Sequence, residues 1–333
     1  MSAYSPLFPT KYKERGVEMV PTSKVKVMKS TKNELLLQIK KHWIFYIFLI
    51  PATVITLLFS YRPYIWLTMA FQDFSFKDGL FGSPFVGLQN FKDILDTPDF
   101  YRVLRNTIMI NVLGLAIGFP VPILFALMIN ELRNDKFKRV TQTITYLPHF
   151  ISWVIVAGLV YKILNEDIGI VNVILRAISG KTVAFLKEPK YFWWVFVLVS
   201  IWKEMGWNSI IYIAAMSGID QELYDAATVD GATKLQKVRY ITLPGIAPTI
   251  ALMLILASGR LLSGASFEAV YPMRNPMINE TAETIQIFNY TQGVLYNRYS
   301  YAAALDLAQA VVAFLLVCVV NYTIKKLRGY GLF

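Results

Sequence analysis

Long apolar runs separated by polar segments dominate the sequence from about residue 43 onward. Six runs are close to the length that a helix needs to cross about 30 Å of hydrocarbon at about 1.5 Å per residue. The pattern therefore predicts an all-α, polytopic membrane protein with six transmembrane helices. The predicted spans cover residues 43–61, 104–129, 144–164, 192–216, 246–264 and 302–324.

The polar segments between the runs differ in charge, which predicts the side of the membrane on which each lies. Lys and Arg are frequent before the first span, between the second and third spans, and in the C-terminal tail, which favours the cytoplasm. The segment after the first span is rich in Asp and is expected outside. Alternation then returns both termini to the cytoplasm. The predicted organisation is a basic cytoplasmic tail at 1–42 and a membrane domain at 43–328.

Composition agrees with a membrane protein and excludes several other functions. The chain has 333 residues, 55% of them hydrophobic, and a net charge of +11. A basic chain can bind nucleic acid, but these cations lie at the ends of apolar runs, so no nucleic-acid partner is expected. Cys318 is the single cysteine, and the two histidines, His42 and His149, are far apart, so no metal site is expected.

Catalytic motifs are not evident in the sequence. No Gly-x-x-x-x-Gly-Lys-Ser/Thr phosphate loop occurs, so the chain is not expected to bind or hydrolyse ATP itself. No arrangement of nucleophile and base stands out either. The sequence therefore predicts a protein that is not an enzyme, with no catalytic residue and no cofactor of its own.

One polar segment, at about 217–248 between the fourth and fifth spans, has a definite pattern. Gln221 to Val229 reads as a short helix, and Asp230-Gly231 reads as a turn in which glycine adopts a positive φ. A second amphipathic helix is expected at 232–241, ending before Leu243-Pro244. Such a cytoplasmic helix–turn–helix, called the elbow below, could dock in a groove of a soluble partner. From periodicity alone, a helix pair that only caps the bundle is an equal alternative.

The residues of the elbow resemble the EAA loop of ABC-importer permeases. Asp225-Ala226-Ala227, Asp230-Gly231-Ala232, Gln236, Leu243-Pro244 and Pro248 follow that pattern, with Asp225 in place of its glutamate and Val238 in place of its usual phenylalanine. The resemblance implies a multi-pass permease of the bacterial inner membrane. It also implies a second homologous permease subunit, an extracytoplasmic solute-binding protein, and two ATPase subunits that bind ATP and Mg. The residues implied in ATPase docking are Asp225, Ala226, Ala227, Asp230, Gly231, Ala232, Leu235, Leu243 and Pro244.

Other segments resemble the oligosaccharide branch of these permeases, with the alginate-type group the nearest match. They are Arg105-Asn106-Thr107, Tyr146-Leu147-Pro148, the stretch from Phe267 to Pro276, and Glu280-Thr281-Ala282-Glu283-Thr284. The resemblance implies import of a sugar, an oligosaccharide or polysaccharide fragment, by alternating access. The alternative is a secondary transporter driven by an ion gradient, although the inverted repeats typical of that class are not evident.

Four residues are candidates for the substrate pathway: Trp202, Asn208, Tyr212 and Arg260. Aromatic faces and amides suit sugars, and charges inside a membrane are often functional. Lys203 and Glu204 are adjacent and therefore point about 100° apart on a helix, so an ion pair between them is not obvious. For Arg260, Lys203 and Glu204, pairing with other groups of the protein is favoured over contact with a substrate. The segment 271–297 is expected to be a long external loop, either contacting a binding protein or an ordinary surface loop.

Overall fold

The computed structural model describes residues 40–262 and 267–328. The chain divides into two compact units, residues 1–63 and 64–333, which are described separately. Apart from an isolated bridge between Gln72 and Phe85, the described residues contain helices, turns and loops but no strand. The prediction of an all-helical polytopic membrane protein is confirmed. Most of the predicted tail at 1–42 lies outside the described residues.

The first unit holds helix α2 (Trp43–Thr56), which continues into a π-helical turn at Leu57–Tyr61. Its side chains are almost all apolar, and none of them is buried. A helix that is apolar all round and unburied is typical of a membrane span. A 3₁₀ segment, Arg62–Phe71, leads from it into the second unit.

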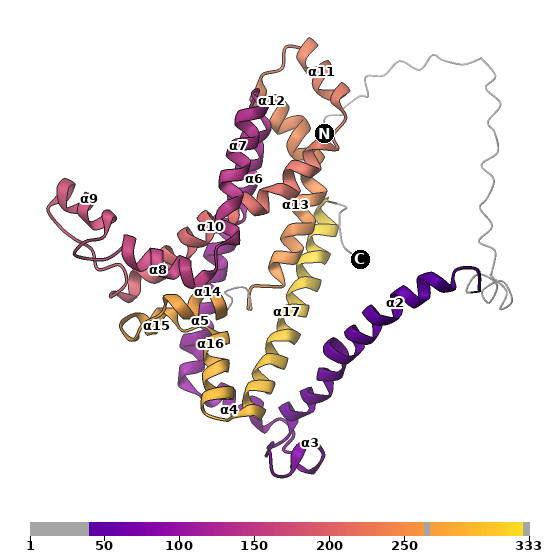
Figure 1. Ribbon diagram of the computed structural model, residues 1–333, viewed down its shortest axis with the longest axis vertical. Coiled ribbons are helices and arrows are strands. Elements are labelled where there is room, and N and C mark those ends of the chain that lie inside the picture. The colour runs from indigo at the N-terminus through magenta and orange to yellow at the C-terminus, as the bar shows by residue number, and fades with distance from the viewer. Residues whose placement is uncertain (1–39, 263–266, 329–333) are drawn as a thin grey trace, which may run out of the picture. The chain divides into compact units, whose positions relative to one another are not determined.

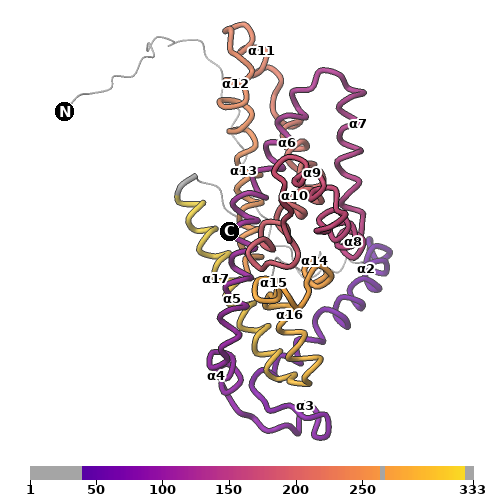
Figure 2. Tube along the Cα trace, turned by 90° about the vertical axis from the view of Figure 1, so that its left-hand side faces the viewer, coloured from indigo at the N-terminus to yellow at the C-terminus, as the bar shows by residue number. Residues whose placement is uncertain are grey.

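The second unit contains the remaining helices (Figure 1). A long helical rod is formed by α5 (Pro98–Leu113), a π turn at Gly114–Gly118 and α6 (Pro120–Asn130). α10 (Phe192–Ser217), α13 (Leu243–Ser258) and α17 (Tyr299–Arg328) are the other long helices. In Figures 1 and 2, α11 (Gln221–Val229) and α12 (Lys234–Lys237) lie at one end of this unit, and α4 (Gln89–Asp96) lies toward the other.

Four helices in the described residues are long and apolar enough to cross a membrane. They are Trp43–Phe71, Pro98–Asn130, Lys234–Ser258 and Tyr299–Lys326, and they contain the first, second, fifth and sixth predicted spans. The predicted end of the fifth span, at 264, lies outside the described residues, and the helix itself ends at Ser258. α10, the predicted fourth span, has 26 residues but is not among the four. It carries Lys203 and Glu204 at its centre, which lowers its apolar character.

The prediction of a continuous third span at 144–164 is wrong. α7 (Asp135–Tyr146) and the 3₁₀ turn η4 (Leu147–Phe150) are followed by α8 (Trp153–Ile163), with a bend of 100° between them. Ile151 and Ser152 have extended backbones, and the Ser152 hydroxyl accepts from the Ile155 N–H to start a new helix. The pair counts as a fifth span if it crosses the membrane as one unit.

The prediction that 271–297 is a long loop is also wrong, whereas its external position stays a prediction. This segment holds short helices and 3₁₀ turns, among them α15 (Asn279–Ala282) and α16 (Ile285–Tyr290). Many of its side chains are buried, and Ile278, Ala282 and Ile287 belong to the largest core cluster, together with residues of α8 and α10. The segment is rich in polar residues, and its polar groups make hydrogen bonds within the protein. Its polar composition therefore does not indicate an exposed loop.

Candidate functional site

The elbow forms at the predicted position, and its first helix has the predicted bounds. Asp220 caps α11 by accepting from the Glu222 N–H, and Gly231 has φ +74°, which confirms the glycine turn. Thr233 and Gln236 then form a reciprocal capping box at the start of α12. Local side-chain chemistry therefore sets both ends of this turn.

The second arm of the elbow differs from the prediction, because it does not end before Leu243-Pro244. α12, the π turn Val238–Thr242 and α13 form one helix, Lys234–Ser258, so this arm is the beginning of a membrane span. In the π turn the Leu243 N–H bonds to the Val238 carbonyl, five residues back. The changed register accommodates Pro244, which has no N–H to donate.

Contacts between its two arms brace the elbow. The Tyr224 hydroxyl lies 2.9 Å from the Thr242 hydroxyl, and Lys237 Nζ donates to the Thr228 hydroxyl at 2.6 Å. Lys234 also pairs with Glu131, at the end of α6, at 3.3 Å. These contacts stiffen a segment that would otherwise be a simple loop.

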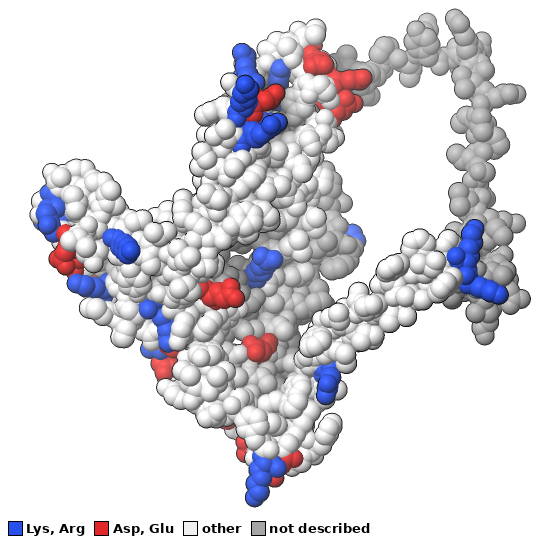
Figure 3. Space-filling model, viewed as in Figure 1, with Lys and Arg blue, Asp and Glu red and all other residues white. Residues whose placement is uncertain are grey.

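Most of the residues implied in docking are exposed, as a surface that meets a partner requires. Leu235 has 77% of its surface exposed, and its apolar neighbour Val229 has 89%. Ala227, Ala232 and Leu243 are half-buried, and Asp225, Ala226, Asp230, Gly231 and Pro244 are exposed. In Figure 3, charged side chains gather over the end that carries α7 and α11, whereas the surface below is mostly uncharged.

A second feature is the close seam between α10 and the break at η4. A Cβ on Gly206 would lie 2.1 Å from the Thr145 carbonyl oxygen, so only glycine allows this approach. Lys203 is 3% exposed, and its Nζ donates to the carbonyls of Pro148 and His149. A buried ammonium group thus satisfies carbonyls that the broken helix leaves free.

The neighbouring charges at this seam interact with one another. Oε2 of Glu204 lies 2.7 Å from Nδ1 of His149, and Oε1 lies 3.6 Å from Nζ of Lys203. The His149 ring stacks on Trp207 with ring centroids 4.4 Å apart. The interpretation that these charges pair structurally agrees with this geometry.

Beside the seam lies a cavity of about 550 Å³ with aromatic and charged walls. Its lining includes His149, Trp153, Lys203, Glu268 and Tyr271. Nζ of Lys203 also lies 5.4 Å from the centre of the Trp153 ring. Sequence reasoning did not predict Trp153 or Tyr271 here, because the bend at Ile151-Ser152 that brings α8 toward 267–272 has no periodic signal.

The four predicted pathway residues do not come together at this cavity. Trp202 and Asn208 are exposed on α10, and Arg260 is exposed just beyond the end of α13. Tyr212 is buried in an apolar cluster with Ile123, Ala126, Met216 and Ile246. Arg260 and Glu268 are eight residues apart and could meet on one helix if it continued that far, but α13 ends at Ser258, and no ion pair joins them in the described part of the chain.

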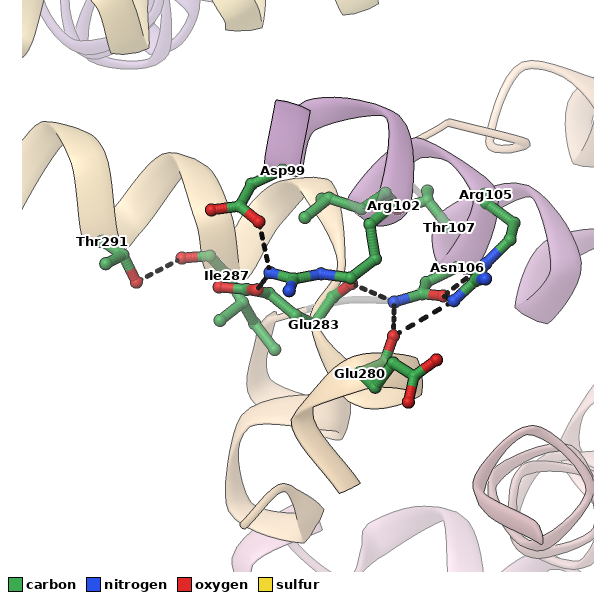
Figure 4. Close-up of polar contacts among 10 residues, drawn as sticks. Asp99, Arg102, Arg105, Asn106, Thr107, Glu280, Glu283, Ile287 and Thr291 are labelled. Atoms are coloured by element: carbon green, nitrogen blue, oxygen red, sulfur yellow. Dashed lines mark hydrogen bonds and ion pairs between the residues drawn. The ribbon is translucent and has the colours of Figure 1, made fainter. Parts of the chain in front are cut away.

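A third feature, the clamp, joins two of the segments quoted for the family resemblance. Asn106 on α5 is fully buried and donates to the carbonyls of Glu280 and Glu283 at 2.8 and 3.0 Å (Figure 4). Thr107 accepts from the Ile285 N–H at 2.9 Å, and Arg102 pairs with Glu283 at 2.6 Å. The clamp therefore fixes the folded 279–285 segment to α5.

Together, these features describe a multi-span protein with a broken helix and a braced elbow between two of its helices. The family model for "Binding-protein-dependent transport system inner membrane component" matches residues 118–329, and the chain belongs to this family. It is the membrane-embedded permease subunit of an ABC importer, a transport component rather than the ATPase. Membership sets aside the alternative of an ion-gradient transporter.

The chain is similar to known proteins over most of its length. Protein LplB of Bacillus subtilis (strain 168) is 39% identical over 86% of this chain and 90% of its own length. The polygalacturonan/rhamnogalacturonan transport system permease protein YteP of the same organism is 38% identical over 92% and 95%. A crystal structure of a bacterial ABC transporter that imports the acidic polysaccharide alginate contains a chain with 39% identity and a TM-score of 0.81, covering 88% of this chain and 99% of that one.

Proposed function

We propose that this permease carries an acidic oligosaccharide, and that the sugar passes through the cavity beside the η4 break. The observation that carries the proposal is the wall of that cavity, in which Trp153, Phe267 and Tyr271 supply aromatic faces. Lys203 supplies a positive charge in the same wall, which also holds the carboxylate of Glu268. Aromatic faces pack on the apolar faces of sugar rings, and a cation attracts carboxylates. Arg260, Trp202 and Asn208 are proposed to line the approach, whereas the burial of Tyr212 favours a packing role.

Relatives support the acidic character of the cargo. The two relatives named for polygalacturonan and alginate, whose sugars carry carboxylates, are 38% and 39% identical to this chain. The arabinooligosaccharide permease AraP of Bacillus subtilis (strain 168), named for a neutral sugar, is 29% identical. The chain is therefore more similar to the acidic-sugar permeases.

The proposed topology has six spans, in which α10 and the bent pair α7–α8 join the four apolar helices. Both termini and the elbow then lie in the cytoplasm. The elbow is proposed to dock on one of two ATPase subunits, and a second, homologous permease completes the pathway. Another structure of the alginate transporter, described as in complex with a pentasaccharide-bound periplasmic protein, supports delivery by a binding protein. ATP and Mg bind the ATPase subunits, and the elbow transmits their closure to the spans.

The cargo is tested with the complete complex in proteoliposomes. We expect its binding protein to stimulate ATP hydrolysis with oligogalacturonate or oligo-alginate and not with neutral arabino-oligosaccharides. Tyr271→Ala should lower the stimulated rate about fivefold and leave the basal rate unchanged, because one aromatic contact contributes on the order of 1 kcal/mol. The control is Tyr322→Ala, at an exposed tyrosine of α17.

Two results would overturn this proposal. Stimulation by neutral oligosaccharides alone would exclude an acidic cargo. Equal stimulated rates for Tyr271→Ala and the control would exclude the cavity as the route.

A further inference from the structure

Helix α9 (Ile170–Ser179) is attached to the molecule by its polar side. Asn172 is fully buried and makes four hydrogen bonds, donating to the carbonyls of Leu164, Asn165 and Val183 and accepting from the Val183 N–H at 2.7 Å. Residues are spaced about 100° apart on a helix, so Ile170 and Ile174 each lie about 160° from Asn172. The helix therefore turns its opposite side outward.

That outward side is aliphatic. Ile170, Val173, Ile174 and Ile178 are exposed by 62, 51, 52 and 80%, and Ile168, just before the helix, by 82%. These five residues are called the α9 face. At ten residues, or about 15 Å, the helix is too short to cross a bilayer. An exposed aliphatic face of this kind normally contacts another protein or a membrane.

The charged residues around the α9 face indicate what kind of partner it contacts. Arg176, Lys181 and Lys162 are exposed nearby, and in the described part of the chain no ion pair with an acid is seen for them. Two acidic residues, Glu166 and Asp167, lie just before the helix. Glu166 pairs with Lys187, which leaves Asp167 beside the basic residues. In Figure 3 the surface at this edge of the unit is mostly uncharged, with several blue side chains and one group of red side chains beside it. Figure 1 shows α9 at one edge of the unit, away from α13 and α17.

We propose that α9 lies in the membrane interface, with the α9 face among the acyl chains and Arg176 and Lys181 on the phosphates of anionic lipids. Amphipathic helices with basic flanks bind bilayers in this way. The face is wholly Ile and Val, whereas protein docking sites are enriched in Trp, Tyr and Arg, so lipid fits better than a partner protein. The helix then fixes the height of the α8–α10 connection in the bilayer. The inference rests on the membrane location of the chain and not on its cargo.

The test places a fluorescent nitrobenzoxadiazole label on the complete complex in nanodiscs. Cys318→Ser provides the background, and the label sits at Ile174→Cys or, as control, at Ser179→Cys on the other side of the helix. We expect lipids with a spin label on the acyl chain to quench the first label at least about twofold more than the second, without binding protein. Equal quenching at both positions, or shielding of position 174 only after loaded binding protein is added, would overturn the proposal.

The basic residues are tested in the same assay. Replacing phosphatidylcholine with phosphatidylglycerol should strengthen quenching at position 174, and the double change Arg176→Gln and Lys181→Gln should remove this dependence. The control is Lys77→Gln, an exposed lysine in a distant turn. An unchanged dependence in the double variant would overturn the assignment of the headgroup contacts. Because neither readout involves transport, either result is independent of the proposed cargo.

Discussion

Asn106 has a fully buried amide that donates to the backbone carbonyls of Glu280, in α15, and Glu283, directly after α15. The sequence marked both 105–107 and 280–284 through their resemblance to one family, but it could not place them together. Contacts between segments so distant in the chain have no local pattern. The same is true of Lys203, for which the sequence favoured structural pairing but could not name the partners. Its Nζ donates to the carbonyls at a break in another helix.

Removing the Asn106 amide should destabilise the permease. In Asn106→Leu the carbonyls of Glu280 and Glu283 lose a donor, and each buried unsatisfied group costs about 1–3 kcal/mol. We expect a fall of several degrees in the thermal unfolding midpoint of the purified complex, measured by intrinsic fluorescence. Ser179→Ala, at an exposed position, should leave the midpoint unchanged. A midpoint for Asn106→Leu equal to that of the control would contradict the clamp.

Two glycines in neighbouring helices should respond differently to the same change. Gly206→Ala places a Cβ 2.1 Å from the Thr145 carbonyl oxygen, and such overpacking costs about 1–3 kcal/mol or more. At Gly158, in α8, a Cβ meets no atom within 4 Å, so Gly158→Ala should be neutral or slightly stabilising. Chemical denaturation of the two variants measures the difference. Equal stability would mean that α7 and α10 do not approach closely.

At the scale of elements, local chemistry decided which predictions held. The bounds of α11 followed from Asp220 and Asp230-Gly231, because caps and turns depend on neighbouring residues. The bend in the third predicted span was missed, because an average over an apolar window does not register one proline and two extended residues. The folded segment 279–290 was missed because several of its polar groups, such as the Thr281 hydroxyl and the Ile285 N–H, form hydrogen bonds that only the tertiary structure provides.

Changing the exposed tip of the elbow should affect assembly and not folding. Leu235 is 77% exposed in the chain alone, so Leu235→Glu costs little within the permease. If this tip docks in a groove, a buried carboxylate there is strongly unfavourable. We expect the variant to reach the membrane in normal amounts and to lose its ATPase subunits during affinity purification.

A matched control separates docking from general damage. Phe81 is 95% exposed in a turn far from the elbow, and Phe81→Glu should retain the ATPase subunits. Retention of these subunits by both variants would exclude Leu235 from the docking surface.

At the scale of the whole molecule, the proposed six-span topology predicts on which side of the membrane each loop lies. Residues 81 and 229 should lie on opposite sides of the membrane. Residue 81 follows the first span, and residue 229 lies in the elbow after the fourth span, so three spans separate them. In a Cys318→Ser background, an impermeant maleimide should label Phe81→Cys in right-side-out vesicles and Val229→Cys in inverted vesicles. Labelling of both from the same side would exclude the six-span arrangement and the role of the elbow.

The continuity of Lys234–Ser258 has a mechanical consequence. Twenty-five residues make a rod of about 37 Å, and the helix continues without a break from the elbow, through the π turn at Val238–Thr242, into its apolar part. If such a rod pivots near its middle, a tilt of about ten degrees moves each tip by roughly 3 Å in opposite directions. A push on the end at Lys234 therefore reaches the other end of the helix as a displacement of similar size and opposite direction, so a single helix can close one gate of the pathway while it opens the other.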